Sequence, residues 1–216
     1  MLWQVLEELG VTGRILDVIK SLYAHDSAAV RSSQGISAIF SCLMGVKQGC
    51  PLSPTLFGLY VDGLEKHLLD TADIDAPTLM GVMLPLLLYA DDLILMSQSA
   101  AGLQKQLDAL ASFSTARQLA INLSKTKVVV FEHRQSEVPD FVLNGAVVER
   151  GAELQVLGLC FARHQSNGVW DSLSGSSCQE SNVCHAEAVC TSGHQGPCYA
   201  VQAIRHVGFT HLELCL

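Results

Sequence analysis

A chain of 216 residues is long enough for one well-packed core, and nothing in its length requires a second one. Hydrophobic residues make up 49% of the chain and charged residues 16%, with a mean hydropathy of +0.32, which excludes disorder throughout. The formal net charge of −8 argues against a chain that grips nucleic acid unaided, because phosphate contacts require clustered Lys and Arg.

Signals for secretion or membrane insertion are missing from the sequence pattern. The first ten residues include Glu7 and Glu8 and lack a basic stretch, which disfavours a signal peptide. The most apolar segment, 79–96, carries Pro85 and two adjacent aspartates, each costing about 2.5–3.5 kcal/mol at the centre of a bilayer helix. We therefore predict no transmembrane segment, and free cysteines in a reducing compartment.

The first third of the chain predicts two helices, a hairpin and a third helix. Apolar residues recur at helical spacing over 2–9, and Thr12 can cap a second helix that extends to Leu22. Residues 28–43 indicate a β-hairpin with a polar turn. A helix capped by Ser53 is expected to run to about Leu69, and its predicted buried residues are Leu56, Tyr60, Leu64 and Leu68.

Strands dominate the expectations for the middle of the chain. Short apolar runs at 84–88 and 93–96 flank Tyr89-Ala90-Asp91-Asp92 and predict two strands joined by a turn. A helix over 100–119 is expected to bury Leu103, Leu107, Leu110 and Phe113. A strand at 128–131, a hairpin at 141–148 around an Asn-Gly turn, and its partner strand at 154–161 complete an α+β fold with helices packed on one face of an antiparallel sheet.

Asp91 and Asp92 are the first candidates for chemistry. Adjacent strand residues point to opposite faces, so the two carboxylates can serve one site only if the backbone turns beside them. No Lys or Arg occurs from His67 through Gln104, so some other positive charge must approach the pair. Mg²⁺ suits this need because it binds carboxylate and phosphate oxygens together. The alternative is an exposed turn whose aspartates are simply solvated.

Four motifs in order carry a resemblance to a known family. Tyr89-Ala90-Asp91-Asp92 between apolar strands resembles the third motif of reverse transcriptases, and residues 45–57, GVKQGCPLSPTLF, resemble the second motif as found in non-LTR retrotransposons. Residues 121–127, INLSKTK, are similar to the next motif, and residues 154–158, LQVLG, resemble the primer-grip hairpin. The resemblance covers most of residues 1–163 and implies a polymerase palm.

The resemblance implies a role for each matching residue. Asp91 and Asp92 would hold Mg²⁺ in a two-metal site; Gln48 and Gly49 would lie beside the incoming dNTP, where the alternative is a plain helix-entry turn. Tyr89 would lie near the primer end, or pack on the core instead. Lys125 would lie near the pyrophosphate leaving group, a role for which Lys127 competes and for which simple solvation is the alternative.

The family also has a further aspartate on an earlier strand, which binds both metals. Asp17 and Asp26 are placed in or after a helix and do not replace it. We therefore expect a palm truncated at its N-terminus, with the fingers and first catalytic strand supplied from upstream, and expect the isolated chain to be inactive. The expected function is RNA-templated DNA synthesis with an RNA template, a DNA primer and dNTP, inside the cell; the alternative is a non-catalytic remnant that acts as an interaction module.

The C-terminal part has a different texture. Residues 164–195 are rich in Ser, Gly, Cys and His without periodicity and are predicted to be disordered, whereas 196–216 resemble the start of the family's thumb helices. The cysteines and histidines in 184–198 suggest a zinc site, but they lack the paired spacing of tight zinc modules. A frame shift or altered splice is the other explanation for this segment.

Overall fold

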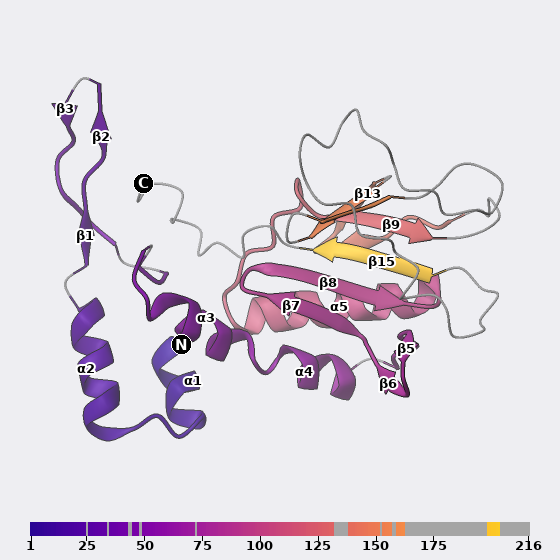
Figure 1. The fold of residues 1–216 in the computed structure, drawn as a ribbon, viewed down its shortest axis with the longest axis horizontal. Coiled ribbons are helices and arrows are strands. Elements are labelled where there is room, and N and C mark those ends of the chain that lie inside the picture. Colours follow the sequence, from indigo (N-terminus) through magenta and orange to yellow (C-terminus); the bar gives the residue numbers. More distant parts are fainter. Residues whose placement is uncertain are drawn as a thin grey trace.

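The computed structural model describes residues 1–24, 26–33, 35–42, 45–47, 49–71, 73–131, 138–151, 153–156, 159–162 and 198–203. Within them the chain combines a helical N-terminal part with a five-stranded sheet (Figure 1). The α+β class predicted from the sequence is confirmed. The predictions for 164–195, including the zinc-binding reading, lie outside the described residues.

The two predicted N-terminal helices are present as α1 (Leu2–Glu8) and α2 (Gly13–Tyr23). Both pack on α3 (Ser53–Val61), because α1 and α2 present Leu6, Leu16 and Ile19 to a cluster that also contains Leu56. Thr12 occupies the cap position of α2 as predicted, but its side chain makes no capping hydrogen bond.

The helix predicted from Ser53 to about Leu69 is two helices, α3 and α4 (Leu64–Thr71). The break falls at Gly63, and glycine is a poor helix former. Ser53 does not cap α3 either: it is the first helical residue, and its hydroxyl donates to the carbonyl of Lys47 at 2.6 Å. The predicted burial is confirmed for all four residues, Leu56, Tyr60, Leu64 and Leu68.

A two-stranded hairpin, which we call the arm, spans residues 27–41. Its base is formed by β1 (Ser27–Ala28) and β4 (Phe40–Ser41), and its outer part by β2 (Arg31–Ser32) and β3 (Gly35–Ile36). The hairpin predicted for 28–43 is thereby confirmed. The arm projects from the end of α2, away from the sheet (Figure 1).

The main sheet has the strand order β12-β9-β15-β8-β7. Its strands are β7 (Leu86–Tyr89), β8 (Asp92–Ser97), β9 (Lys127–Phe131), β12 (Glu149–Arg150) and β15 (Cys198–Ala203). All pairs are antiparallel except β12 with β9. Residues 198–203 were expected to begin helices; they instead form the central strand, which a run of alternating small and β-favouring residues permits.

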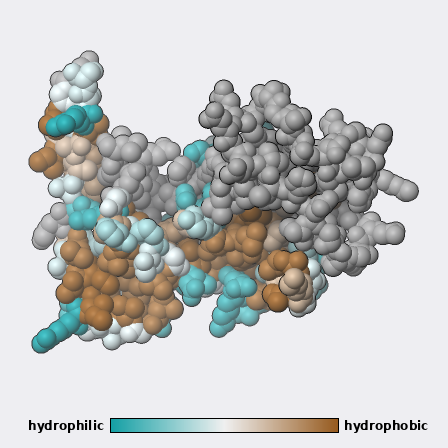
Figure 2. Space-filling model, viewed as in Figure 1, coloured by the Kyte–Doolittle hydropathy of each residue, from teal (hydrophilic) through white to brown (hydrophobic). Residues whose placement is uncertain are grey.

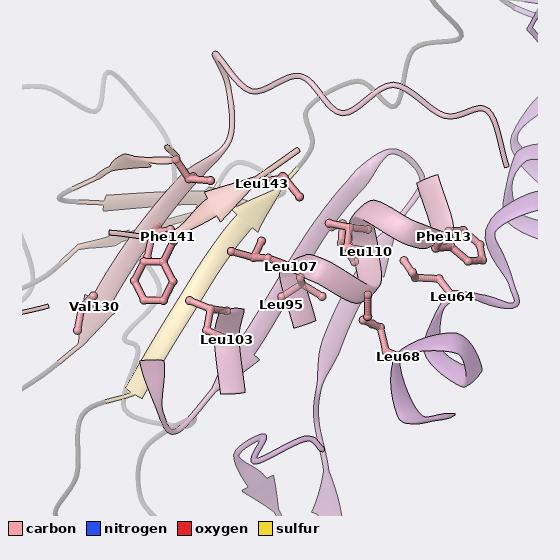
Figure 3. Packing of buried hydrophobic residues seen from close by; sticks show 14 residues of the cluster. Leu64, Leu68, Leu95, Leu103, Leu107, Leu110, Phe113, Val130, Phe141 and Leu143 are labelled. Carbon is pink, nitrogen blue, oxygen red and sulfur yellow. The ribbon is translucent and has the colours of Figure 1, made fainter. Parts of the chain in front are cut away.

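Helix α5 (Ala100–Ala116) lies under this sheet and forms the main core with it (Figures 1 and 3). Ser99 caps the helix by accepting a hydrogen bond from the Gly102 amide. The predicted buried positions of the helix are confirmed, and they meet Leu93 and Leu95 of β8 and Val128 and Val130 of β9. Ile94, Met96 and Val129 alternate with these residues and belong to a second cluster on the other face.

Smaller hairpins complete the described structure. β10 (Val142–Leu143) and β11 (Ala146–Val147) flank Asn144 and Gly145, whose φ values of 52° and 78° confirm the predicted Asn-Gly turn. The single strand expected over 154–161 is instead a hairpin of its own, β13 (Glu153–Val156) with β14 (Leu159–Ala162). A further hairpin pairs β5 (Thr78–Leu79) with β6 (Val82–Met83). None of the described helices is long and apolar enough to cross a membrane.

Candidate functional site

The turn between β7 and β8 carries the two candidate aspartates. Tyr89 and Asp92 form the closing pair of the hairpin, so Ala90 and Asp91 are the two central residues of the loop. Ala90 has a φ of 50° and Asp91 is not among the residues with positive φ, the sign pattern of a type II′ turn. This turn joins the strands with the smallest possible loop and brings both carboxylates to one end of the sheet.

The register fixes which face of the sheet Asp92 and Tyr89 share. Residues two apart on a strand lie on the same face, so Asp92 is on the face of Ile94 and Met96, opposite to α5. Tyr89 is directly across from Asp92 and therefore lies on that face too. Tyr89 is 64% exposed, so it does not pack on the core, which was the alternative position for this residue. Asp91 and Asp92 are half-buried.

The start of β9 reaches the same end of the sheet. Lys127 pairs with Gln202 of β15, and Gln202 pairs in turn with Ile94 of β8. Ile94 lies two residues after Asp92, the first residue of β8. Two strand spacings, about 10 Å, separate β8 from β9. Lys127 forms an ion pair with Glu149 at 3.5 Å, whereas Lys125 is exposed in the turn that precedes the strand. The topology thus brings the predicted lysine segment to the end of the sheet that holds the aspartates.

The glycine loop before α3 has its own defined geometry. The Cys50 amide donates to the Lys47 carbonyl at 3.3 Å, closing a turn in which Gly49 has a φ of 76°. Glycine adopts a positive φ without the steric cost that a Cβ would bring. No atom outside its immediate neighbours lies within 4 Å of a Cβ built on Gly49, so the backbone conformation alone calls for glycine. Gln48 lies outside the described residues.

The same loop places Cys50 in a polar environment. A hydrogen bond from the Leu52 backbone is the largest of several that lower the pKa of the Cys50 thiol, and the hydroxyls of Ser53 and Tyr23 contribute to the same shift. Tyr23 and Ser53 are themselves joined by a hydrogen bond of 3.1 Å. This contact could not be predicted from the sequence, because Tyr23 is remote from Cys50 along the chain.

The donor chemistry at the β7–β8 turn fits a hard divalent cation. It consists of carboxylate oxygens, which Mg²⁺ prefers, rather than sulfur or imidazole groups. Among the described residues no group of three or more His, Cys, Asp or Glu side chains is arranged to hold a metal ion. The turn by itself therefore supplies two carboxylates, the kind of donor set that engages a cation shared with phosphate oxygens.

The structure combines two carboxylates at a tight turn on one end of the sheet with a glycine loop at a helix entry. This combination suits a class of proteins that handle phosphate groups through a cation. Comparison with known proteins makes the assignment specific. The chain belongs to the reverse transcriptase (RNA-dependent DNA polymerase) family, whose model matches residues 1–169.

Individual relatives come from mobile elements. The chain is 28% identical over 162 residues to the RNA-directed DNA polymerase from mobile element jockey of Drosophila melanogaster, a match that covers 69% of this chain and 17% of that protein. It is 31% identical over 124 residues to the Pol polyprotein from the type-1 retrotransposable element R2 of Popillia japonica, covering 57% of this chain and 17% of the relative. The chain thus spans about a sixth of the length of these curated relatives.

These matches confirm the resemblance to reverse transcriptases of non-LTR retrotransposons. They favour the hypothesis of a polymerase segment over the hypothesis of a non-catalytic interaction module.

Proposed function

We propose that this chain is part of the palm domain of a retrotransposon polymerase, which extends a DNA primer on an RNA template. In this proposal the β7–β8 turn is part of the Mg²⁺ site. The observation that carries the proposal is the turn itself: a two-residue loop sets Asp91 and Asp92 at the end of a sheet, with Tyr89 on the same face as Asp92. The family match supports the reaction class. When bound, the metal would supply charge stabilisation for the triphosphate and the attacking 3′-hydroxyl.

The residues around the turn receive roles consistent with their positions. Tyr89, exposed across from Asp92, would contact the primer end. Gly49, whose turn leaves open space around its Cα, would let the nucleotide approach the loop closely, with Gln48 beside it. Lys125 is exposed in the turn before β9, a strand that begins two strand spacings from β8, and this lysine suits the pyrophosphate end of a bound dNTP.

Two carboxylates from one turn do not complete a two-metal site. The ions in such sites lie roughly 3.5–4 Å apart, and their ligands normally come from separate strands. We therefore propose that a further carboxylate and the fingers come from other parts of the polymerase, and that the chain alone does not synthesise DNA.

Metal binding at the turn can be tested without catalysis. Tb³⁺ replaces hard cations at oxygen sites, and its emission is sensitised by a nearby tyrosine, which Tyr89 provides. We expect Tb³⁺ emission that Mg²⁺ competes away and that is lost in Asp91→Asn and Asp92→Asn. Asp17→Asn, which removes the same charge from the exposed surface of α2, serves as the control. Emission unchanged in the Asp91 and Asp92 variants would remove the turn as the metal site.

Catalysis is tested by primer extension on an RNA template. The chain alone is expected to give no product, whereas a longer polymerase that includes this segment is expected to extend the primer and to lose activity in Asp91→Asn. Robust, Asp91-dependent synthesis by the chain alone would refute the proposal that its metal site is incomplete. Full activity of the longer polymerase with Asp91→Asn would refute the proposed function.

A further inference from the structure

The two edges of the main sheet differ in their chemistry. At one edge lies β12, which consists of Glu149 and Arg150. Both residues form ion pairs, Glu149 with Lys127 at 3.5 Å and Arg150 with Asp140 at 3.0 Å. Charged side chains on an edge strand oppose its pairing with another sheet. At the other edge lies β7, Leu86–Tyr89, which carries no charge and therefore lacks this protection.

The register of the β7–β8 hairpin turns some backbone groups of β7 outward. The Met96 amide donates to the Pro85 carbonyl at 2.9 Å, so Pro85 faces β8. Inward and outward groups alternate along an antiparallel strand, so Leu87 also faces β8, whereas Leu86 and Leu88 direct their N–H and C=O groups away from it. Pro85 lacks only an N–H that would point inward, so the outer edge keeps its donors. Within the part of the chain that the structure describes, no strand pairs with this side of β7.

Exposed apolar side chains flank the edge on both faces. Leu87 is 47% exposed on the face of Ile94, and Leu88 is 38% exposed on the face of α5. The β5–β6 hairpin leads into β7 and adds four exposed apolar residues, Leu79, Met80, Val82 and Met83. Figure 2 shows apolar surface where Figure 1 places β7 and this hairpin. We call β7 together with the β5–β6 hairpin the apolar edge.

The tip of the β5–β6 hairpin carries an apolar residue in a strained conformation. Met80 and Gly81 form its two-residue loop with φ values of 50° and 83°, and the β10–β11 hairpin places Asn144 and Gly145 at the same two positions with φ values of 52° and 78°. Asparagine tolerates a left-handed backbone because its side chain can hydrogen-bond locally, which methionine cannot do. Met80 is nevertheless 98% exposed, so packing within the chain does not account for a methionine here.

From these observations we infer that the apolar edge is a dimer interface, in which β7 pairs antiparallel with β7 of a second copy of the chain. A two-fold axis beside Leu87 places Leu86 of one copy opposite Leu88 of the other, so the outward N–H and C=O groups of both copies form hydrogen bonds. The aspartate turns then lie at opposite ends of the joined sheet, because the paired strands run in opposite directions. The inference goes beyond the proposed function and does not depend on it.

The size and charge of the surface set the expected affinity. The four residues of β7 span about 13 Å, which is too small for a standard interface of about 800 Å² on each partner, so the hairpin has to contribute. Each copy has a net charge of −8, which opposes association until salt screens it, whereas residues 76–90 add no charge to the contact. We therefore expect a weak dimer with a Kd of roughly 1–50 µM that decreases as salt is raised.

The test is sedimentation equilibrium of the purified chain at concentrations that bracket this Kd. The mass is expected to rise from 23.2 kDa towards twice that value. Leu87→Lys is expected to raise the Kd at least about 10-fold, because it places two ammonium groups across from each other at the axis. Val147→Lys is the matched control: it makes the same charge change at an exposed apolar residue of β11 and is expected to stay within about twofold of the wild type.

The turn residues provide a second pair of variants, which does not put a charge on the edge. Met80→Asn is expected to raise the urea midpoint of the monomer, because asparagine suits the left-handed backbone, and to raise the dimer Kd about threefold through the lost apolar contact. Asn144→Met makes the reverse exchange in the β10–β11 turn. It is expected to lower the urea midpoint and to leave the dimer Kd unchanged.

Several results would overturn the inference. These are a wild-type chain that stays monomeric up to about 100 µM at high salt, equal effects of Leu87→Lys and Val147→Lys, and a mass that grows beyond the dimer without a limit. Hydrogen exchange that protects β7 in a longer polymerase but not in the concentrated chain would show that another segment covers the apolar edge, and would also overturn it. Circular dichroism of each variant checks that the fold is retained, and the Tb³⁺ and primer-extension results decide the proposed function separately.

Discussion

Asp92 begins β8 directly across from Tyr89, the last residue of β7, and the left-handed conformation of Ala90 makes this pairing possible. An L-residue at a φ of 50° carries steric strain that glycine does not have. The position of both carboxylates therefore depends on a residue that the sequence motif contains but whose conformation it does not reveal.

Substitutions at Ala90 should separate strain from chemistry. Ala90→Gly is expected to raise the free energy of unfolding by about 0.5–1 kcal/mol, since relief of strain exceeds the entropy that glycine adds to the unfolded chain. Ala90→Val, which places a β-branched residue at positive φ, is expected to lower it by about 1–2 kcal/mol and to reduce Tb³⁺ emission. Urea unfolding gives both values. Equal stability of the two variants would show that the turn relaxes to another conformation.

Gly102 is required for a different reason, which is space. A Cβ at this position would overlap the Asp75 carboxylate and the Ser97 hydroxyl, and these two groups are hydrogen-bonded to each other at the start of α5. Gly102→Ala is therefore expected to destabilise the protein by about 1–3 kcal/mol, measured by urea unfolding.

The matched control for Gly102 is Gly58→Ala in α3, where no such neighbour lies within 4 Å. Alanine has the better helix propensity, so this variant is expected to gain up to about 1 kcal/mol. A gain of stability in both variants would mean that the Asp75 side chain moves aside without cost.

Periodicity made much of the fold predictable. Helix α5, the β7–β8 hairpin and the Asn144-Gly145 turn each follow from spacing or turn chemistry that is local in the sequence. The break at Gly63 between α3 and α4 was missed because the apolar spacing continues through it and a single glycine in a helical pattern gives an ambiguous signal.

Long-range pairing was the part that local reasoning could not supply. The central position of β15, between β8 and β9, depends on contacts between residues more than 60 positions apart in sequence, and no turn signal links them. The aspartate turn was found from local sequence, whereas the alignment of the Lys125–Lys127 segment with that end of the sheet follows only from the register through β15.

Cys50 offers a pH-dependent readout of the glycine loop. Because hydrogen bonds, chiefly from the Leu52 backbone, lower the pKa of its thiol, the reactive thiolate is expected to form at lower pH in the folded chain than in the urea-unfolded chain. Iodoacetamide labelling over a pH series, read at the Cys50 peptide by mass spectrometry, measures this shift. Ser53→Ala removes one contributing hydroxyl and should move the folded profile towards higher pH. Coincident folded and unfolded profiles would contradict the loop geometry.

Tyr60 joins α3 to the end of α5, and its phenol should make stability depend on alkaline pH. The Tyr60 hydroxyl donates to the carbonyl of Arg117, the residue that caps the C-terminus of α5, and Tyr60 is 2% exposed. Tyr60→Phe leaves that carbonyl without its phenol partner and is expected to cost about 1–2 kcal/mol at neutral pH, measured by urea unfolding.

Burial is the main cause that raises the pKa of Tyr60, and the nearby Arg117 charge opposes it. A tyrosine in the unfolded chain ionises near pH 10, so the contribution of Tyr60 is fully present below that pH and is lost as pH rises through the higher pKa of the folded state. The free energy of unfolding of the wild type is therefore expected to fall more steeply above about pH 10 than that of Tyr60→Phe. Parallel curves for the two proteins would show that the phenol of Tyr60 reaches solvent and ionises without disturbing the contact between α3 and α5.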